Sequence, residues 1–376
     1  MINAIETMPF EPARYELEVK ESRLRGLMDQ LSLDALLLSR RDSFAWTTGG
    51  KNNHVNKSSE MGFFDLLVLP HGKFCLANRI EAPRAMEEEL AGQGYELAEY
   101  EWWQGREETV RRIVGTGRLG ADGPFPGSME INEALRCLRF SLLPDEAVRF
   151  RQVGRLTTDA LEQTAREIEP GWSEHRIAAR MSERAMLQGV EAVVTLVAAD
   201  ERIFRYRHPI DTEKRLEHYA MLVLCGRKYG LVANLTRLVH FGPPPGELRD
   251  KCEKVAIIDA EMIARTVAGV GLGDIFRAGM AAYAAVGYPD EWKLHHQGGV
   301  AGYNGREILA VPDSPEKVQN SQAFAWNPSI RGAKSEDTIL VLGDRPEILT
   351  ASEGWPSLAI ELFDGSILMR PDLLVR

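Results

Sequence analysis

The segment 229-YGLVANLTRLVHFG-242 follows an apolar run, 219-YAMLVLC-225, after a short polar interval. Both runs are rich in residues that favour β-strands, and the second reads as a hairpin-like return of the first. Because successive side chains of a strand alternate, Asn234 and Thr236 share one face and their neighbours the other. The two runs therefore predict an antiparallel strand pair with polar groups on one face.

The elements around this pair predict an α+β domain. A strand-like run over 191–199 precedes it, after a long helix and a second helix that begins behind the N-cap Ser173. Strands, then helices, then strands predict one curved, mostly antiparallel sheet. The expected helices lie over 146–168, 174–187, about 246–268 and 273–286, and two further strands over 322–328 and 337–342.

Helical and strand-like patterns alternate over residues 14–122, which predicts a smaller α/β domain. Its expected helices lie over 14–30, 81–94 and 107–115, and its strands over 34–40, 95–103 and 118–122, with a hairpin over 61–77. A proline and a charged helix start in 141-SLLPDEAVRFRQV-153 indicate the boundary. We expect an N-terminal domain over 1–143 and a second domain over 144–376.

Composition excludes several classes of protein. The net charge of −10 lacks the positive field that nucleic acids require. Four widely spaced cysteines indicate reduced thiols rather than disulfides or a zinc cluster. The first twenty residues do not resemble a signal peptide, and the longest apolar runs are too short for a membrane span. We expect a cytoplasmic protein that binds neither nucleic acid nor membrane.

Histidines mark the candidate site. In 294-LHHQGGVAGYNGRE-307, His295 and His296 beside glycines and an acid are typical of a metal site. Neighbouring residues of an extended segment point to opposite faces, so at most one of these rings is expected in a given cavity. His208 in 206-YRHPID-211 precedes a proline, which predicts an irregular segment between two strands.

A polar stretch between two apolar strands is the remaining candidate. The segment 324-FAWNPSIRGAKSEDT-338 is interpreted either as part of a site or as a solvated turn. Its polar residues are Asn327, Arg331, Lys334, Glu336 and Asp337. No phosphate-binding loop or nucleophile elbow occurs, and Cys225, within an apolar run, is expected to be buried and inert.

Taken in order, these segments resemble the creatinase / methionine aminopeptidase superfamily, peptidase family M24 with the pita-bread fold. The resemblance covers nearly the whole chain, and the first part resembles the smaller α/β domain of creatinase and the prolidases. The matching segments are PGWSEHRIA, RHPIDTEKRL, YGLVANLTRLVHFG, LHHQGG, FAWNP and SEDTILV.

The resemblance implies a position for each metal ligand of the family, which are two Asp, one His and two Glu. In chain order these positions fall at Leu224 or Val223, Asn234, His296 or His295, Asn327 and Glu336. Three of the four carboxylates are missing, whereas a pair of divalent ions needs several anions. We therefore expect no metal and no other cofactor, although a single zinc held by His, Glu and a further ligand stays possible.

Creatinase, the metal-free member, is the closer likeness. Its A-H-N-P segment resembles RHP here, and its Y-Y-G-R-E stretch resembles YNGRE, which includes Arg306 and Glu307. The first segment carries the acid/base histidine of creatinase, which implies that role for His208. Creatinase has Glu at the position of Asn327 and a second histidine where this chain has Gly302 or Tyr303, so its substrate and mechanism do not transfer intact.

We hypothesise a metal-independent hydrolase or lyase that acts on a C–N bond of a small polar nitrogenous molecule of guanidino, amide or lactam type. His208 would be the general base. His296 or His295, with Tyr303 and Glu336, would orient the substrate and return the proton. Substrate would be bound by the amides of Asn234 and Asn327, which offer donors and acceptors, and by Arg306 and Glu307.

Two alternatives remain open: a metal-dependent Xaa-Pro aminopeptidase or dipeptidase, and a non-catalytic protein that binds small molecules. The resemblance also implies a homodimer in which the N-terminal domain completes the partner's site. Candidates for that contribution are Arg41, Phe44 and His54.

Overall fold

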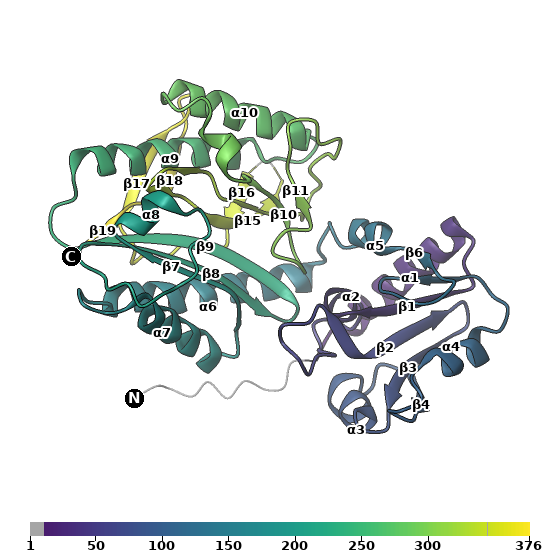
Figure 1. The fold of residues 1–376 in the computed structure, drawn as a ribbon. Coiled ribbons are helices and arrows are strands. Elements are labelled where there is room, and N and C mark those ends of the chain that lie inside the picture. The colour runs from purple at the N-terminus through teal and green to yellow at the C-terminus, as the bar shows by residue number, and fades with distance from the viewer. Residues whose placement is uncertain (1–10, 344) are drawn as a thin grey trace. The chain divides into compact units, whose positions relative to one another are not determined.

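The computed structural model describes residues 11–343 and 345–376 and contains two compact units, Met1–Arg139 and Phe140–Arg376 (Figure 1). The division lies a few residues before the boundary that the sequence suggests. Half of the segment used to argue against a signal peptide, residues 1–10, lies outside the described residues. Among the described helices, none is both long and apolar enough to cross a bilayer.

The first unit is built on a six-stranded mixed sheet with the order β4-β3-β2-β1-β5-β6. Its strands are β1 (Ala35–Arg40), β2 (Met61–Leu69), β3 (Gly72–Asn78), β4 (Glu96–Tyr100), β5 (Leu119–Ala121) and β6 (Met129–Glu130). The helices are α1 (Arg14–Leu31), α2 (Arg41–Thr47), α3 (Ala82–Arg84), α4 (Glu107–Val114) and α5 (Asn132–Leu138). The α/β character and the hairpin that turns at His71-Gly72 agree with the sequence.

The helix expected over 81–94 is wrong in its second half. α3 gives way to a π-helical turn, η1 (Ala85–Glu89), and regular structure ends at Leu90. Gly92 and Gly94 both have positive φ, a conformation that a helix cannot contain. The acidic residues 87–89 had extended the apparent helical pattern.

Two residues proposed to reach a partner's site are held within the first unit. Phe44 is fully buried and packs edge-to-face on Phe64, with ring centroids 5.3 Å apart. Arg41 is buried and donates from Nη1 to the carbonyl of Lys57 at 2.7 Å. Their contribution to a partner's site stays a prediction.

The second unit contains the predicted antiparallel strand pair. β8 (Tyr219–Lys228) pairs with β9 (Leu231–His240) and with β7 (Glu191–Ala199), and β19 (Leu374–Val375) joins β9 in parallel. Helices α6 (Pro144–Glu167) and α7 (Glu174–Leu187) pack on one face of this four-stranded sheet (Figure 1). Their shared core contains Leu161, Ile177, Leu222 and Leu235.

A second, five-stranded sheet completes the unit, with the order β11-β10-β12-β15-β16. Its strands are β10 (Gly298–Ala301), β11 (Ile308–Leu309), β12 (Ala323–Trp326), β15 (Asp337–Leu342) and β16 (Arg345–Ile348). Helices α9 (Gly246–Arg265) and α10 (Leu272–Ala285) share a core with both sheets. The two sheets meet where the amide of Thr236 donates to the carbonyl of Glu336 at 3.1 Å. The sequence predicted one curved sheet, whereas the structure contains two sheets joined at this point.

The remaining elements are short. They are α8 (Glu201–Arg205), the 3-10 turn η2 (Glu291–Leu294), the hairpin of β13 (Ser329–Ile330) with β14 (Ala333–Lys334), and the hairpin of β17 (Ser357–Glu361) with β18 (Ile367–Pro371).

A chain of buried ion pairs runs behind the junction of the two sheets. Arg237 on β9 contacts Glu162 of α6 and Asp337 of β15, each at 3.1 Å. Arg370 on β18 contacts Asp337 at 2.6 Å, and its Nε donates to Asp259 of α9 at 3.1 Å. All five side chains are buried. The pairs therefore connect two helices to strands of different sheets.

Replacing Arg237 with Met is expected to lower the free energy of unfolding by about 3–5 kcal/mol, because it removes the cation that contacts the buried Glu162 and one of the two that contact Asp337. Urea unfolding measures this change. Arg249→Met removes a pair with Asp372 in which the arginine is 46% exposed, and should change stability by less than about 0.5 kcal/mol. Equal losses in the two variants would contradict the role assigned to Arg237.

Candidate active site

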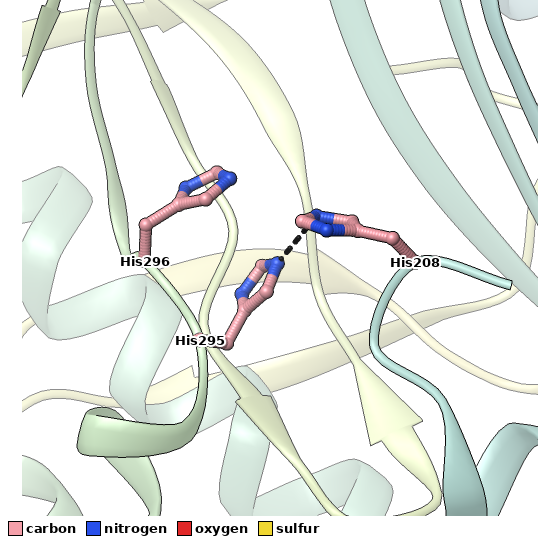
Figure 2. Close-up of side chains that lie close together, drawn as sticks. All are labelled: His208, His295 and His296. Atoms are coloured by element: carbon pink, nitrogen blue, oxygen red, sulfur yellow. Dashed lines mark hydrogen bonds between the residues drawn. The ribbon is translucent and has the colours of Figure 1, made fainter.

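Three histidines converge in the second unit (Figure 2). His208 comes from the segment between α8 and β8, and His295 and His296 lie between η2 and β10. One ring nitrogen from each lies within 4.8 Å of the others, and the Nε2 atoms of His208 and His295 are 3.0 Å apart. The three rings thus form one cluster of hydrogen-bonding nitrogens.

Both adjacent histidines belong to this cluster, so the expectation that at most one could face a common cavity was wrong. The rings of His295 and His296 stack with centroids 4.4 Å apart, and both approach His208 (Figure 2). They precede β10 rather than lie within it. His295 has extended backbone, but neither residue is paired in a sheet, so no strand register forces their side chains onto opposite faces.

The glycines after the histidines allow β10 to pair closely with its neighbours. Gly298 has a φ of +100°, and a Cβ there would lie 2.0 Å from the carbonyl oxygen of Ala325. Between the histidines and Gly298, the carbonyl of Gln297 accepts from the amide of Asn327 at 3.0 Å. The side chain of Gln297 accepts from the hydroxyl of Tyr283 at 2.7 Å. This backbone arrangement places Asn327 beside the histidine segment.

Glu336 is already paired with two protein cations. Its Oε2 lies 2.7 Å from Nζ of Lys334 and accepts from the hydroxyl of Thr236 at 2.7 Å, and its Oε1 lies 3.0 Å from Nη2 of Arg306. Burial alone would raise the pKa of this carboxyl, but Lys334 and Arg306 outweigh it and hold the pKa well below its usual range. Glu336 is therefore ionised and internally compensated.

The histidines are neutral at ordinary pH. Burial is the main cause, with Lys334 next, of a pKa of about 2 for His295. Burial and then Arg306 lower the pKa of His296 to about 4. His208 is exposed to solvent on one side, but partial desolvation and Lys334 lower its pKa as well. Neutral rings offer free nitrogens that can accept a proton or a hydrogen bond.

Two buried amides complete the polar lining. Asn234 and Asn327 are 1% and 2% exposed, and within the described part of the chain neither side-chain oxygen accepts a hydrogen bond. Asn234 shares its face of β9 with Thr236, which contacts Glu336. Buried carbonyl oxygens without donors are costly unless a ligand or water supplies the donor. Both positions therefore suit N–H groups of a bound molecule.

Other predicted site residues have structural partners. The hydroxyl of Tyr303 donates to Glu146 of α6 at 2.6 Å, and the carboxylate of Glu307 accepts from the amides of Tyr303 and Asn304. Arg306 lies in the same turn and reaches Glu336. Cys225 is buried and burial raises its pKa to about 12, as its apolar setting suggests.

Strand register decides between the two positions for the family's first aspartate. Val223 pairs with Thr236, and its side chain belongs to the core between the two sheets. Leu224 packs in the opposite core against α6 and α7. Val223 therefore occupies the site face.

These residues do not fit a pair of divalent ions. Val223 has no ligand atom, Asn234 and Asn327 are uncharged, and both oxygens of Glu336 are engaged by protein cations. Adding two further positive ions beside Lys334 and Arg306 would be strongly unfavourable in a buried site. The arrangement can instead move a proton between neutral imidazoles and bind a polar molecule.

Comparison with known proteins places the chain in a family. The model of metallopeptidase family M24 matches residues 148–342, just over half of the chain. An Xaa-Pro dipeptidase of Pyrococcus horikoshii is 21% identical over 89% of this chain and 97% of its own. The crystal structure of a prolidase from Pyrococcus horikoshii OT3 superimposes with a TM-score of 0.77 at 18% identity, over 89% of this chain and 98% of that chain.

An uncharacterized peptidase of Staphylococcus epidermidis is 21% identical over 60% of this chain, and the matched part spans 66% of that protein's length. The chain belongs to metallopeptidase family M24, a family of hydrolases, and the predicted family is confirmed. The structural likeness confirms the α+β fold with a pita-bread domain.

Sequence reasoning named Lys334 in the polar stretch 324–338 but assigned it no role in the proposed reaction. The signal was available, because Lys334 and Glu336 are two residues apart in a strand-like segment and such residues share a face. A charged turn nevertheless has the same pattern. Only the 2.7 Å contact between the two side chains separates the alternatives.

Stability is expected to fall as the pH drops below about 6.5, the ordinary pKa of histidine. The unfolded chain then protonates its histidines, whereas the folded protein keeps His295 and His296 neutral to far lower pH. Unfolding takes up protons in this range, so its free energy should decrease by on the order of 2 kcal/mol for each of these two histidines between pH 6.5 and 4.5.

Urea unfolding across this range tests the expectation. His295→Phe, which has no group to protonate, should reduce the slope. A wild-type protein whose stability is level between pH 6.5 and 4.5 would contradict neutral buried histidines.

Proposed function

We propose that this member of metallopeptidase family M24 hydrolyses a C–N bond of a small polar nitrogenous molecule without a metal ion, with His208 as the general base. The observation that carries the proposal is the pairing of His208 with the neutral, buried His295 at 3.0 Å. The family's remaining site glutamate, Glu336, is compensated by protein cations instead of metal ions.

The unpaired amide oxygens support the substrate class. Asn234 and Asn327 each present a buried acceptor that lacks a donor among the described residues. A guanidino, amide or lactam group carries N–H donors that would satisfy them. A bare cation such as a quaternary ammonium carries no N–H group and would leave both oxygens unpaired.

The histidine pair supplies the proton chemistry. A hydrogen bond between two Nε2 atoms requires one ring to donate and the other to accept, so the pair can take up one more proton. In the proposed reaction His208 accepts a proton from water, and the oxygen attacks the carbon of the C–N bond. The protonated pair then returns the proton to the departing nitrogen as that bond breaks.

Arg306 and Lys334 have a supporting role in this proposal. They keep Glu336 ionised, and after burial, the larger cause, their charge lowers the pKa values of the histidines, so the resting rings are neutral and each has a nitrogen lone pair. Nε of Arg306 is buried and donates to no acceptor among the described residues. This N–H group is available to a carbonyl or anionic group of the substrate.

His208→Ala is expected to lower kcat by at least 100-fold, the usual contribution of a general base, while leaving the unfolding midpoint nearly unchanged because His208 is exposed. Hydrolysis of creatine, simple lactams and small amides, followed by release of amine, measures activity. His218→Ala, an exposed histidine before β8, is the matched control. Full activity in His208→Ala would remove the proposed base, and substrate binding without turnover in the wild type would favour a binding protein.

A metal-dependent Xaa-Pro dipeptidase is the second candidate. It is favoured by the name of the Pyrococcus relative and by the three histidine nitrogens within 4.8 Å, a separation that one zinc ion could bridge after small ring rotations. Neutral imidazoles are common zinc ligands.

We expect the dialysed protein to contain less than about 0.1 metal ion per chain by elemental analysis, because Glu336, Lys334 and Arg306 together carry a net positive charge that disfavours a cation. Manganese or cobalt should not produce cleavage of Ala-Pro. One tightly bound ion per chain that is lost in His295→Phe, together with cleavage of Ala-Pro, would replace the first proposal with the second.

A further inference from the structure

The base proposed above lies on a segment with little regular structure. Between β7 and β8 the chain forms only the short helix α8, and His208 follows it in an exposed stretch. The side chain of His208 contacts His295 at 3.0 Å, which orients the ring but does not hold the backbone. The neighbouring Arg207 donates to the hydroxyl of Ser329 at 3.0 Å, and the carbonyls of Thr212 and Lys214 accept from the amides of His175 and Glu174 at 3.1 and 3.0 Å. These contacts hold the segment beside and after His208.

A buried carboxylate adds side-chain contacts at both ends of the segment. Glu174, at the start of α7, is fully buried. Its Oε1 accepts from the amide of Ala199 at 2.8 Å, at the end of β7. Its Oε2 accepts from the amide of Thr212 at 2.9 Å and from the hydroxyl of Thr212 at 2.7 Å. One carboxylate thus binds the segment both before and after His208.

An arginine extends these contacts toward the histidine. Arg202 pairs with Oε2 of Glu174 through Nη1. Its other terminal nitrogen, Nη2, donates to the carbonyl of Ile210 at 2.8 Å, two residues after His208. The backbone is therefore held by Arg202 at Ile210, two residues after His208, and by Glu174 at Thr212.

We propose that Glu174 is a positioning residue for His208, acting through the backbone of residues 199–212. Charge-assisted hydrogen bonds to a buried carboxylate are among the strongest that proteins make. Displacement of a catalytic group by about 1 Å can cost roughly 100-fold in rate. This inference rests on the proposed function only for the consequence in catalysis, because the position of His208 can be measured without a substrate.

A nearby pair provides a matched control. His175, the residue after Glu174, contacts Asp211 of the same segment through Nδ1 and Oδ2 at 2.6 Å. The His175 side chain is 51% exposed, so the pair is screened by solvent and should hold the segment weakly. If any contact to the segment were sufficient, His175→Ala and a Glu174 variant would have equal effects.

The test combines two measurements on the full-length protein. Trypsin cleavage after Arg205 and Arg207, within the segment, reports local opening. The NMR signal of the His208 ring, assigned by its absence in His208→Ala, reports the environment of that side chain. Neither measurement requires the substrate to be known, so both remain interpretable if the proposed reaction is wrong.

In Glu174→Gln, we expect cleavage at these arginines to accelerate about tenfold and the His208 signal to shift or broaden, because the amide places donors against the donors of the segment. Thr212→Val, which removes one donor, should have a smaller effect in the same direction. Thr212→Ser retains the hydroxyl and should resemble the wild type, as should His175→Ala.

Two results would overturn the proposal. One is an unchanged His208 signal in folded Glu174→Gln and Thr212→Val. The other is a lower unfolding temperature with normal cleavage of the segment, which would make Glu174 a contributor to stability alone. Where an assay substrate is found, Glu174→Gln should lower kcat at least tenfold with little change in KM, since the altered residue does not touch the substrate.

Discussion

The junction between β9 and β15 is the constraint on which the site depends. The backbone of Thr236 bonds to that of Glu336, and the next residue on each strand, Arg237 and Asp337, forms a buried ion pair on the opposite face. Because side chains alternate along strands, the same register that connects the charges behind the sheet directs Thr236 and Glu336 toward the histidines. A shift of one residue along both strands would turn Thr236 and Glu336 away from the histidines and put Arg237 and Asp337 in their place.

In the proposed function, Lys334 and Arg306 balance the charge of Glu336 in place of metal ions. Lys334 and Arg306 contact both oxygens of Glu336, and the positions that the family resemblance assigns to three other carboxylates hold a valine and two amides. Without metal ions and without these two cations, the carboxylate of Glu336 would be a buried charge with no cationic partner, which is costly. The cations offset it, and their field also favours the neutral state of the three imidazoles.

Long periodic elements were predictable because their patterns reflect burial of one face. The helix α7 and the strand β7 match their expected bounds, and α6 begins two residues earlier than expected, at Pro144. The segment 81–94 failed because three glutamates prolonged a helical pattern past the point where glycines end it. The hairpin of β17 and β18 was not predicted, because the sequence of β18 is an apolar run that ends in Arg370 and Pro371, and its alternation of exposed and buried side chains comes from packing on α9.

By itself, the sequence determined the family, the α+β class and the residue types of the site, because these follow from ordered motifs and from the chemistry of single positions. The tertiary structure decided which groups meet. It brought His295 and His296 together beside His208, selected Val223 over Leu224, and paired Lys334 with Glu336. These outcomes depend on strand register and on irregular backbone between elements, where side-chain direction is set by contacts between distant segments rather than by local periodicity.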